Sequence, residues 1–283
     1  MKPTMRPACP ADLPAILAIS AAALDTHTHA LFCHPFRESH PAAFLRVFQR
    51  HARKKALTEP DGVNFNVVIE DPDSGQVVAW AFWRRMQGVA LEEKLEKCRK
   101  ELQSAEQTAT SAPRAMTHES TSPQDDEWTS DDEESSPSAS RCRVRLTNAL
   151  TAADNLLYFS APHWYLSLLM VHPEYKRAGH GTRLTLWGMK RAAADGLPCL
   201  LVASDQGERL YGRLGWRMVG RRKFPKLEDM PDDERRREEE LLGKDVVEEQ
   251  FAASAPSVMV WGDAEADFDV FERYKSAMEG VMD

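Results

Sequence analysis

Hydrophobic positions along the chain follow two different periods, which predicts a protein that mixes strands with helices. Continuous or alternating apolar runs predict strands over residues 3–8, 64–70, 76–83, 164–171, 198–203, 216–220 and 257–261. Helical spacing of apolar residues predicts helices over residues 13–24, 44–51, 182–194 and 206–214. Between the second and third strands, Asp71 to Gly75 has the composition of a tight turn, so these strands should form a hairpin. We expect one α/β (α+β) domain over residues 1–283.

Three stretches interrupt this pattern. Residues 103–140 are rich in Ser, Thr, Asp, Glu and Pro and almost free of large apolar side chains, which predicts a disordered acidic insert, because little apolar surface could offset the entropy of ordering it. Flanking residues 91–102 and 144–157 are expected to form helical arms, interpreted as solvated extensions, with partner binding as the alternative. Residues 226–250 are dominated by charge and predict a helical excursion before the last strand.

Charge and composition limit the partners. The formal net charge is −8. Residues 103–140 hold nine acids and one base, Arg114, which accounts for all of it. The rest of the chain is balanced, so no nucleic acid is expected as a partner. No apolar run approaches the length of a membrane span, so no membrane partner is expected. Serines and threonines followed by acids or prolines in the insert make a kinase a possible partner: Ser122, Thr129, Ser130 and Ser136.

The N-terminal region and the cysteines bear on the compartment. Lys2 and Arg6 precede an apolar stretch, residues 13–24, that could be a signal peptide, although helical spacing and the first-turn Asp12 favour a first helix. Five scattered cysteines favour a reducing compartment. A cytoplasmic location is expected, with a nuclear one as the alternative.

The most informative segment is residues 168–184, where a strand leads through a turn into a helix. The first amides of a helix lack intrahelical partners and lie at its positive end, so they form an anion site. Gly179 and Gly181 would let a phosphate approach these amides, and Lys176 and Arg177 add positive charge. Position 184 is Leu, so the third glycine of the dinucleotide fingerprint is absent.

At this point the sequence resembles the GNAT superfamily of acyl-CoA N-acyltransferases. The family pattern is L-x-V-x-P, then Gln/Arg-x-x-Gly-x-Gly/Ala opening a helix; residues 169–173 read LMVHP and residues 176–181 read KRAGHG, with Lys176 in place of Gln or Arg. Residues 200–204 (LLVAS) and 211–216 (YGRLGW) are similar to the family's next strand and Tyr-x-x-x-Gly-Phe helix end. The resemblance is loose over residues 3–83, close over 163–222, and looks like fungal members.

The resemblance implies a mixed, mostly antiparallel central sheet flanked by helices, and direct acetyl transfer from acetyl-CoA to a primary amine, expected to be that of a small molecule. It implies that Tyr211 is the general acid for the departing thiolate. It also implies a set of acetyl-CoA-binding residues: Leu169, Met170, Val171, Lys176, Arg177, Ala178, Gly179, His180, Gly181, Thr182 and Ser204. Two alternatives remain open: a protein lysine or N-terminal acetyltransferase, and a degenerate CoA-binding scaffold without turnover.

The general base is not identified by the sequence. The strand before the turn carries no acid, and His163 and His172 at its ends are candidates. Residues 25–34 hold His27, His29 and His34 beside Cys33. No second ligand group with zinc-type spacing follows, so no metal is expected there. Substrate contact and an ordinary polar loop are the remaining interpretations of this stretch.

Overall fold

The computed structural model describes residues 3–24, 28–58, 61–110, 133–252 and 255–262. Their centre is a seven-stranded sheet in the order β1-β2-β3-β4-β5-β7-β6. Only β4 and β5 are parallel, and every other neighbouring pair is antiparallel, so the expected mixed, mostly antiparallel sheet is confirmed. The strands are β1 (Thr4–Pro7), β2 (Asn64–Glu70), β3 (Val77–Met86), β4 (His163–Val171), β5 (Cys199–Ala203), β6 (Arg217–Arg221) and β7 (Ser257–Trp261).

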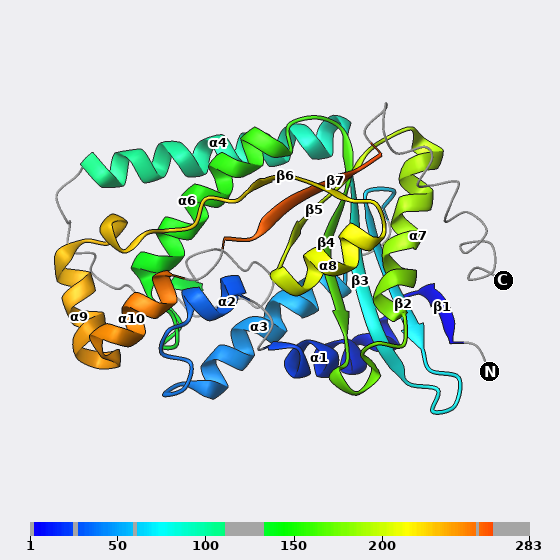
Figure 1. Ribbon diagram of the computed structural model, residues 1–283, viewed down its shortest axis with the longest axis horizontal. Helices are drawn as coiled ribbons and strands as arrows, with labels where there is room; N and C mark the ends of the chain where they lie inside the picture. Colours follow the sequence, from blue (N-terminus) through cyan, green and yellow to red (C-terminus); the bar gives the residue numbers. More distant parts are fainter. Residues whose placement is uncertain (1–2, 25–27, 59–60, 111–132, 253–254, 263–283) are drawn as a thin grey trace.

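Helices cover both faces of this sheet (Figure 1). Because successive strand residues point to opposite faces, β2 and β3 feed two separate cores. Trp80 and Phe82 pack with α1 (Leu13–Ala22) and α3 (Pro41–Ala56) on one face. Ala81 and Trp83 pack on the other face, which α7 (His180–Asp195) and α8 (Asp205–Arg213) cover. Short 3-10 helices connect these elements in the described chain, among them η1 (Pro10–Asp12), η3 (Pro173–Tyr175) and η4 (Leu227–Asp229).

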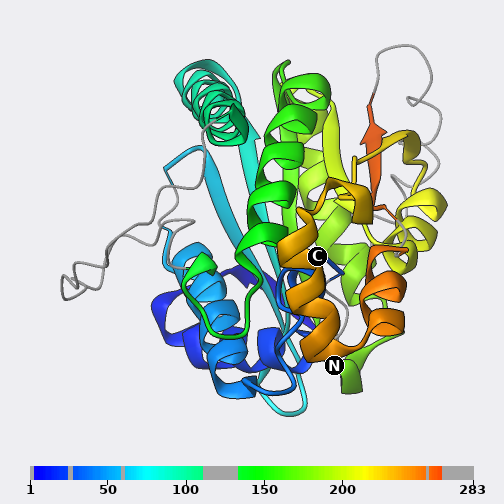
Figure 2. The same ribbon diagram turned by 90° about the vertical axis from the view of Figure 1, so that its left-hand side faces the viewer.

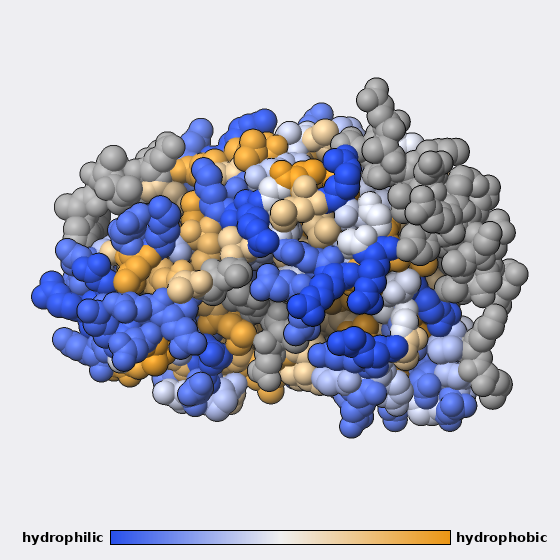
Figure 3. Space-filling model, in the orientation of Figure 1, coloured by the Kyte–Doolittle hydropathy of each residue, from blue (hydrophilic) through white to orange (hydrophobic). Residues whose placement is uncertain are grey.

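The remaining helices build a second layer at the end of the molecule where α9 and α10 lie (Figures 1 and 2). It contains α2 (Thr28–Cys33), α4 (Gly88–Thr110), α6 (Arg141–Tyr158), α9 (Asp232–Leu242) and α10 (Lys244–Phe251). The outer surface over α9 is mainly hydrophilic (Figure 3), as its sequence DDERRREEELL requires. The expected charged excursion thus consists of η4, α9 and α10.

One buried arginine connects this layer. The fully buried guanidinium of Arg143 in α6 lies 2.6 Å from the carboxylate of Glu238 in α9 and donates to Gln250 of α10. It also stacks over the ring of Phe32 in α2, with its carbon 5.0 Å from the ring centre. The arm that α6 forms is therefore packed between α2, α9 and α10, not solvated as expected. Local sequence could not indicate this, because every partner of Arg143 is distant along the chain.

The stretch expected to be disordered is ordered at both ends. Residues 103–110 continue α4, while residues 133–140 lead into α6. Ser138 and Ser140 are buried, the Phe36 amide donates to the Ser138 carbonyl, and the Ser140 amide donates to the Cys33 carbonyl. The prediction of disorder was wrong for residues 133–140, because polar residues can be buried when distant backbone groups satisfy them. Residues 111–132 of the insert lie outside the described residues.

Strands β4 and β5 separate part-way along their length. They pair at Trp164–Cys199, Tyr165–Leu200 and Leu166–Leu201, and no further. Beyond this point β4 remains paired with β3, and β5 remains paired with β7. The register of β4 against β3 also shifts here, because Phe82 lies opposite Leu168 while Trp83 lies opposite Leu166, which leaves Ser167 as the extra residue of a bulge. A bulge bends its strand and raises the local twist, so it opens a wedge between β4 and β5.

Within the described residues, no helix combines the length and the apolar character that crossing a bilayer requires.

The close approach of α7 to β3 depends on Gly188. A Cβ added there would overlap the indole of Trp83, whose Nε1 donates to the Leu184 carbonyl. We expect Gly188→Ala to destabilise the fold by about 1–3 kcal/mol, the usual effect of overpacking a core. Gly212→Ala is the matched control, because Gly212 is exposed on α8 with nothing near its Cβ, and should stabilise by up to about 1 kcal/mol. Urea unfolding of both variants measures this, and equal stabilities would contradict it.

Candidate active site

The turn between β4 and α7 presents an array of free amides. The amides of Ala178 to Thr182 donate to no backbone carbonyl within the described chain, and the first helical bond of this turn runs from Arg183 to the Gly179 carbonyl. Arg177 and Gly179 both adopt left-handed backbone conformations, with φ of 69° and 81°. Alternation of right- and left-handed residues turns successive amides toward one point, which forms an anion-binding concavity. The side chains from Lys176 to Gly179 are exposed.

Gly181 keeps the turn close to its neighbours. A Cβ at this position would lie 3.2 Å from Leu210 of α8 and 3.6 Å from Leu169 of β4. Leu169 and Val171 belong to the part of β4 beyond its separation from β5. His180 is the first residue of α7 and is buried, and its Nδ1 has no hydrogen-bond partner among the described atoms. The free amides and the open edge of β4 therefore lie on one continuous side of the sheet.

Tyr211 lies on α8, which follows β5. Its side chain is buried and its ring packs on Trp216, with ring centres 5.6 Å apart. Burial raises the pKa of Tyr211 well above its ordinary value, so the hydroxyl keeps its proton at neutral pH. This hydroxyl makes no hydrogen bond within the described part of the chain. Gly215 adopts the left-handed conformation expected at the end of this helix, with φ of 82°. Ser204, in contrast, uses its hydroxyl to cap α8 by accepting from the Gly207 amide.

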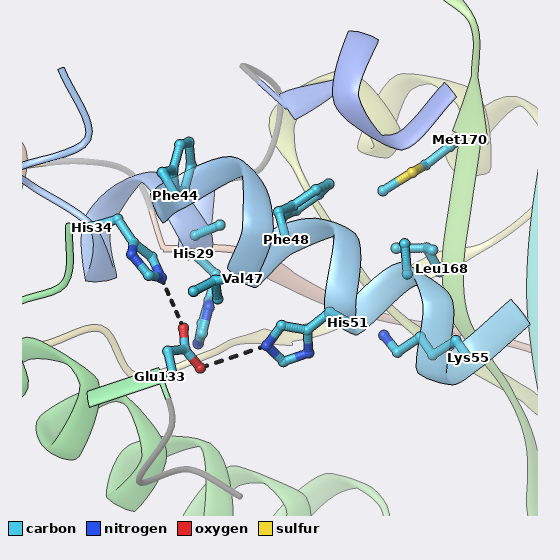
Figure 4. Close-up of a pocket in the computed structure, with 12 residues that line it drawn as sticks. His29, His34, Phe44, Val47, Phe48, His51, Lys55, Glu133, Leu168 and Met170 are labelled. Atoms are coloured by element: carbon cyan, nitrogen blue, oxygen red, sulfur yellow. Dashed lines mark hydrogen bonds and ion pairs between the residues drawn. The ribbon is translucent and has the colours of Figure 1, made fainter. Parts of the chain in front are cut away.

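A cavity of about 250 Å³ lies on the opposite face of β4 (Figure 4). Leu168 and Met170, just beyond the bulge, form its inner wall. The opposite wall comes from α2, α3 and Glu133, the residue at which the described chain resumes after the insert. Its apolar lining is Ala30, Phe44, Val47, Phe48, Ala52, Leu168 and Met170.

Glu133 is the centre of the polar side of this cavity. Its carboxylate lies 3.2 Å from Nε2 of His34 and 3.7 Å from Nε2 of His51. Burial would raise the pKa of Glu133, but the hydrogen bond from His34 and the contact with His51 outweigh it, and the pKa lies well below its ordinary value. His29 is exposed but opens onto the same cavity, and partial loss of hydration lowers its pKa. The cavity thus contains one fixed carboxylate faced by three imidazoles.

A model of the acetyltransferase (GNAT) family matches residues 27–216, which is most of the chain. The chain belongs to the GNAT acetyltransferase family. An acetyltransferase from the fungus Stachybotrys chartarum is 31% identical over 83 residues, 29% of this chain and 36% of that protein. The match therefore spans about a third of the relative's length.

Several solved structures are similar. One is the histone acetyltransferase HPA2 and related acetyltransferase from Corynebacterium glutamicum; it has a TM-score of 0.48 and 18% identity, with 92% of this chain and 96% of that chain covered. A mosquito arylalkylamine N-acetyltransferase-like protein has a TM-score of 0.48 and 14% identity, with 91% and 98% covered. The family assignment rests on the family model.

Membership in the GNAT family implies acyl transfer that depends on acetyl-CoA. The residues predicted to bind this co-substrate lie on β4, on the turn after it and, for Ser204, at the start of α8. The two histidines considered as bases lie elsewhere. Nδ1 of His163 lies 2.6 Å from the Ala161 carbonyl, and burial lowers the pKa of His163 to about 4. His172 accepts from the Glu174 amide in η3, and neither ring lines the cavity.

The residues around His29, which the sequence grouped together, have different surroundings in the structure. Residues 25–27 lie outside the described residues. His29 and His34 line the cavity, whereas Cys33 is buried against Thr147, and burial raises the pKa of the Cys33 thiol to about 12. No group of three or more potential ligands in the described chain has the geometry of a metal site. Sequence reasoning missed His51 and Glu133, because one occupies an ordinary helical position and the other lies in a stretch expected to be disordered.

Gly179 provides a test of the anion-binding turn. We expect Gly179→Glu to weaken acetyl-CoA binding by at least about 100-fold, because a carboxylate would stand where the free amides converge. Gly196→Glu is the control: Gly196 has a similar φ of 65° and equally open surroundings, but lies at the other end of α7. Calorimetric titration with acetyl-CoA measures the difference. Equal affinities in the two folded variants would show that the turn does not bind the pyrophosphate.

The ordered end of the insert provides a second test. Replacing residues 103–140 with a Gly/Ser linker should abolish activity and reduce stability, because it removes Glu133 from the cavity and the buried Ser138 and Ser140. Replacing only residues 111–132 with a Gly/Ser linker of equal length should preserve both. Thermal unfolding and thiol release from acetyl-CoA measure the outcome. A fully active variant of the longer replacement would contradict the role of residues 133–140.

Proposed function

We propose that this GNAT protein acetylates a primary amine of a small molecule, with acetyl-CoA and the amine bound together. The observation that supports this most is the arrangement of two sites on opposite faces of β4. Free amides at residues 178–182 and the open edge of β4 lie on one side, and the cavity lies on the other. A thioester held along the wedge would present its carbonyl carbon at the bulge, next to Leu168 and the cavity.

The wedge suits the acyl carrier. Where β4 and β5 separate, the backbone groups on that edge of β4 have no strand partner among the described residues. An extended arm rich in amides, such as pantetheine, can satisfy them as an added strand would. In this proposal the backbone of Leu169, Met170 and Val171 brackets the arm, and Lys176 to Thr182 hold the pyrophosphate. The backbone amides at the bulge polarise the thioester carbonyl.

The cavity suits a small acceptor. A volume of about 250 Å³ is at the low end for ligand pockets. Its walls are mostly apolar, with one carboxylate, which matches an amine on a compact apolar body. A protein acetyltransferase would instead need an extended groove for a peptide. A CoA-binding scaffold would not need an acceptor site next to the thioester.

A library of amines tests this choice. Free thiol released from acetyl-CoA is measured with alkylamines, arylalkylamines, polyamines and lysine peptides. Turnover of small amines well above that of the peptides supports the proposal. Preference for peptides would favour the protein acetyltransferase, and acetyl-CoA binding without any turnover would favour the scaffold.

Tyr211 is proposed as the acid that protonates the leaving thiolate. Its raised pKa keeps the proton available, and its hydroxyl has no competing partner in the described chain. We expect Tyr211→Phe to lower kcat by about 10²–10⁴-fold, the usual contribution of general acid catalysis, with acetyl-CoA affinity unchanged. Tyr158→Phe, on α6, is the control for loss of a hydroxyl. A Tyr211→Phe enzyme as fast as the control would leave Tyr211 with a packing role alone.

A further inference from the structure

The acceptor amine must lose its proton, and the strand residues that could take it carry no acid. A free alkyl amine has a pKa near ~10, so it arrives as an ammonium ion. On β4 the residues at the cavity are Leu168 and Met170, which cannot accept a proton. The described groups of the cavity that can are His29, His34, His51, Glu133 and Lys55.

From these contacts we infer that His51 is the general base, and that Glu133, supplied by the end of the insert, holds and orients it. This inference rests on the proposed amine acetylation. It also gives residues 133–140 a role in the reaction that the sequence alone did not suggest.

Position and exposure distinguish His51 from the other candidates. His51 lies on α3 one turn before Lys55, and its side chain is 39% exposed where it lines the cavity. His34 is only 1% exposed, and both of its ring nitrogens are engaged, one by Glu133 at 3.2 Å and the other by Ser138 at 2.9 Å. His34 therefore anchors Glu133 and does not reach the acceptor.

Nε2 of His51 is the ring nitrogen that faces the Glu133 carboxylate, at 3.7 Å (Figure 4). In the proposal the ring proton is on Nε2, and Nδ1 takes the proton of the acceptor. Glu133 itself remains an anion at any pH where the enzyme works, because its pKa is depressed. A fixed negative charge beside an imidazole stabilises the imidazolium that forms when the base accepts a proton.

The charges on every side of Glu133 agree with this role. His29 faces it from α2, His34 from the residue just after α2, and His51 from α3. Lys55 lies one turn farther along α3, and Arg222 is near enough to disfavour a charge on His29. His29 has a lowered pKa and is a poor holder of a proton. Burial lowers the pKa of Lys55 to about 8, so this ammonium is partly neutral in alkaline solution and is the competing base.

The reaction balances with these residues. The acceptor ammonium gives one proton to Nδ1 of His51, and its lone pair attacks the carbonyl carbon of the thioester. As the C–S bond breaks, the sulfur takes the proton of Tyr211. The second proton of the nitrogen returns to Tyr211 through water, and His51 releases its proton to solvent. The products are the N-acetyl amide, CoA and one proton.

The test uses the full chain, acetyl-CoA and the amine that the library shows to be turned over fastest. We expect His51→Gln to lower kcat/KM for the amine by about 10²–10⁴-fold, with acetyl-CoA affinity unchanged. The pH dependence of kcat/KM should also differ from that of the wild type, because the group that takes the proton of the acceptor is lost. His40→Gln is the matched control, because His40 precedes the same helix, is exposed and does not line the cavity.

Glu133 acts through His51, so substitutions of Glu133 should change how the rate depends on pH. Glu133→Gln should shift the acidic limb of the profile to lower pH and reduce kcat, since the imidazolium loses its counter-charge. Glu133→Asp keeps the charge and should restore part of the loss, and Glu38→Gln on the exposed loop before α3 should change nothing.

Two results would overturn the inference while the proposed function stands. The first is an active His51→Gln enzyme with an unchanged pH profile. The second is that Lys55→Met, and not His51→Gln, loses the rate and the acidic limb of the pH profile. A wild type that binds acetyl-CoA and acetylates no amine would refute the proposed function, and this role with it.

Discussion

The parting of β4 from β5 is the constraint on which the rest of the molecule depends. Three residue pairs join these strands, and the bulge at Ser167 then bends β4 away while each strand keeps its outer neighbour. An open edge inside a sheet leaves polar backbone groups without partners, which is costly unless a ligand or water satisfies them. The same geometry brings the end of β4 to the free amides before α7. The wedge and the turn with free amides therefore lie next to each other along the same strand.

The second layer of helices supplies part of the wall of the cavity next to the bulge of β4. Arg143 draws α2, α6, α9 and α10 together through Phe32, Glu238 and Gln250. With α2 fixed in this way, His34 is buried and holds both Glu133 and Ser138. The residues after the insert thus become a wall of the cavity. A buried ion pair contributes little net stability, but breaking one leaves an uncompensated charge, so the position of α2 depends strongly on this contact.

The titratable groups of the two candidate sites lie on opposite faces of β4. Tyr211 lies among apolar neighbours on the α7 face, where burial keeps its proton in place. The imidazoles and Glu133 lie on the α3 face, where a fixed negative charge favours taking up a proton. In the proposed mechanism an acid and a base separated by a strand act on opposite sides of one carbonyl without neutralising each other, which agrees with direct transfer in a ternary complex.

Sequence alone was sufficient for the features that depend on neighbouring residues. Continuous or alternating apolar runs located the seven strands of the described chain, and Gly179, Gly181 and Gly215 marked the turns where backbone conformation matters. It was misleading where partners are distant. Ser138 and Glu133 are polar residues in an acidic stretch, and composition argued for disorder there. Both are ordered because the His34 ring bonds to their side chains and the Phe36 amide donates to the Ser138 carbonyl. These partners lie more than ninety positions away in the sequence. His51 carried no local signal at all. Strand, turn and helix follow from short-range sterics and periodicity, whereas a cavity assembled from α2, α3, β4 and the end of an insert exists only once the chain has folded.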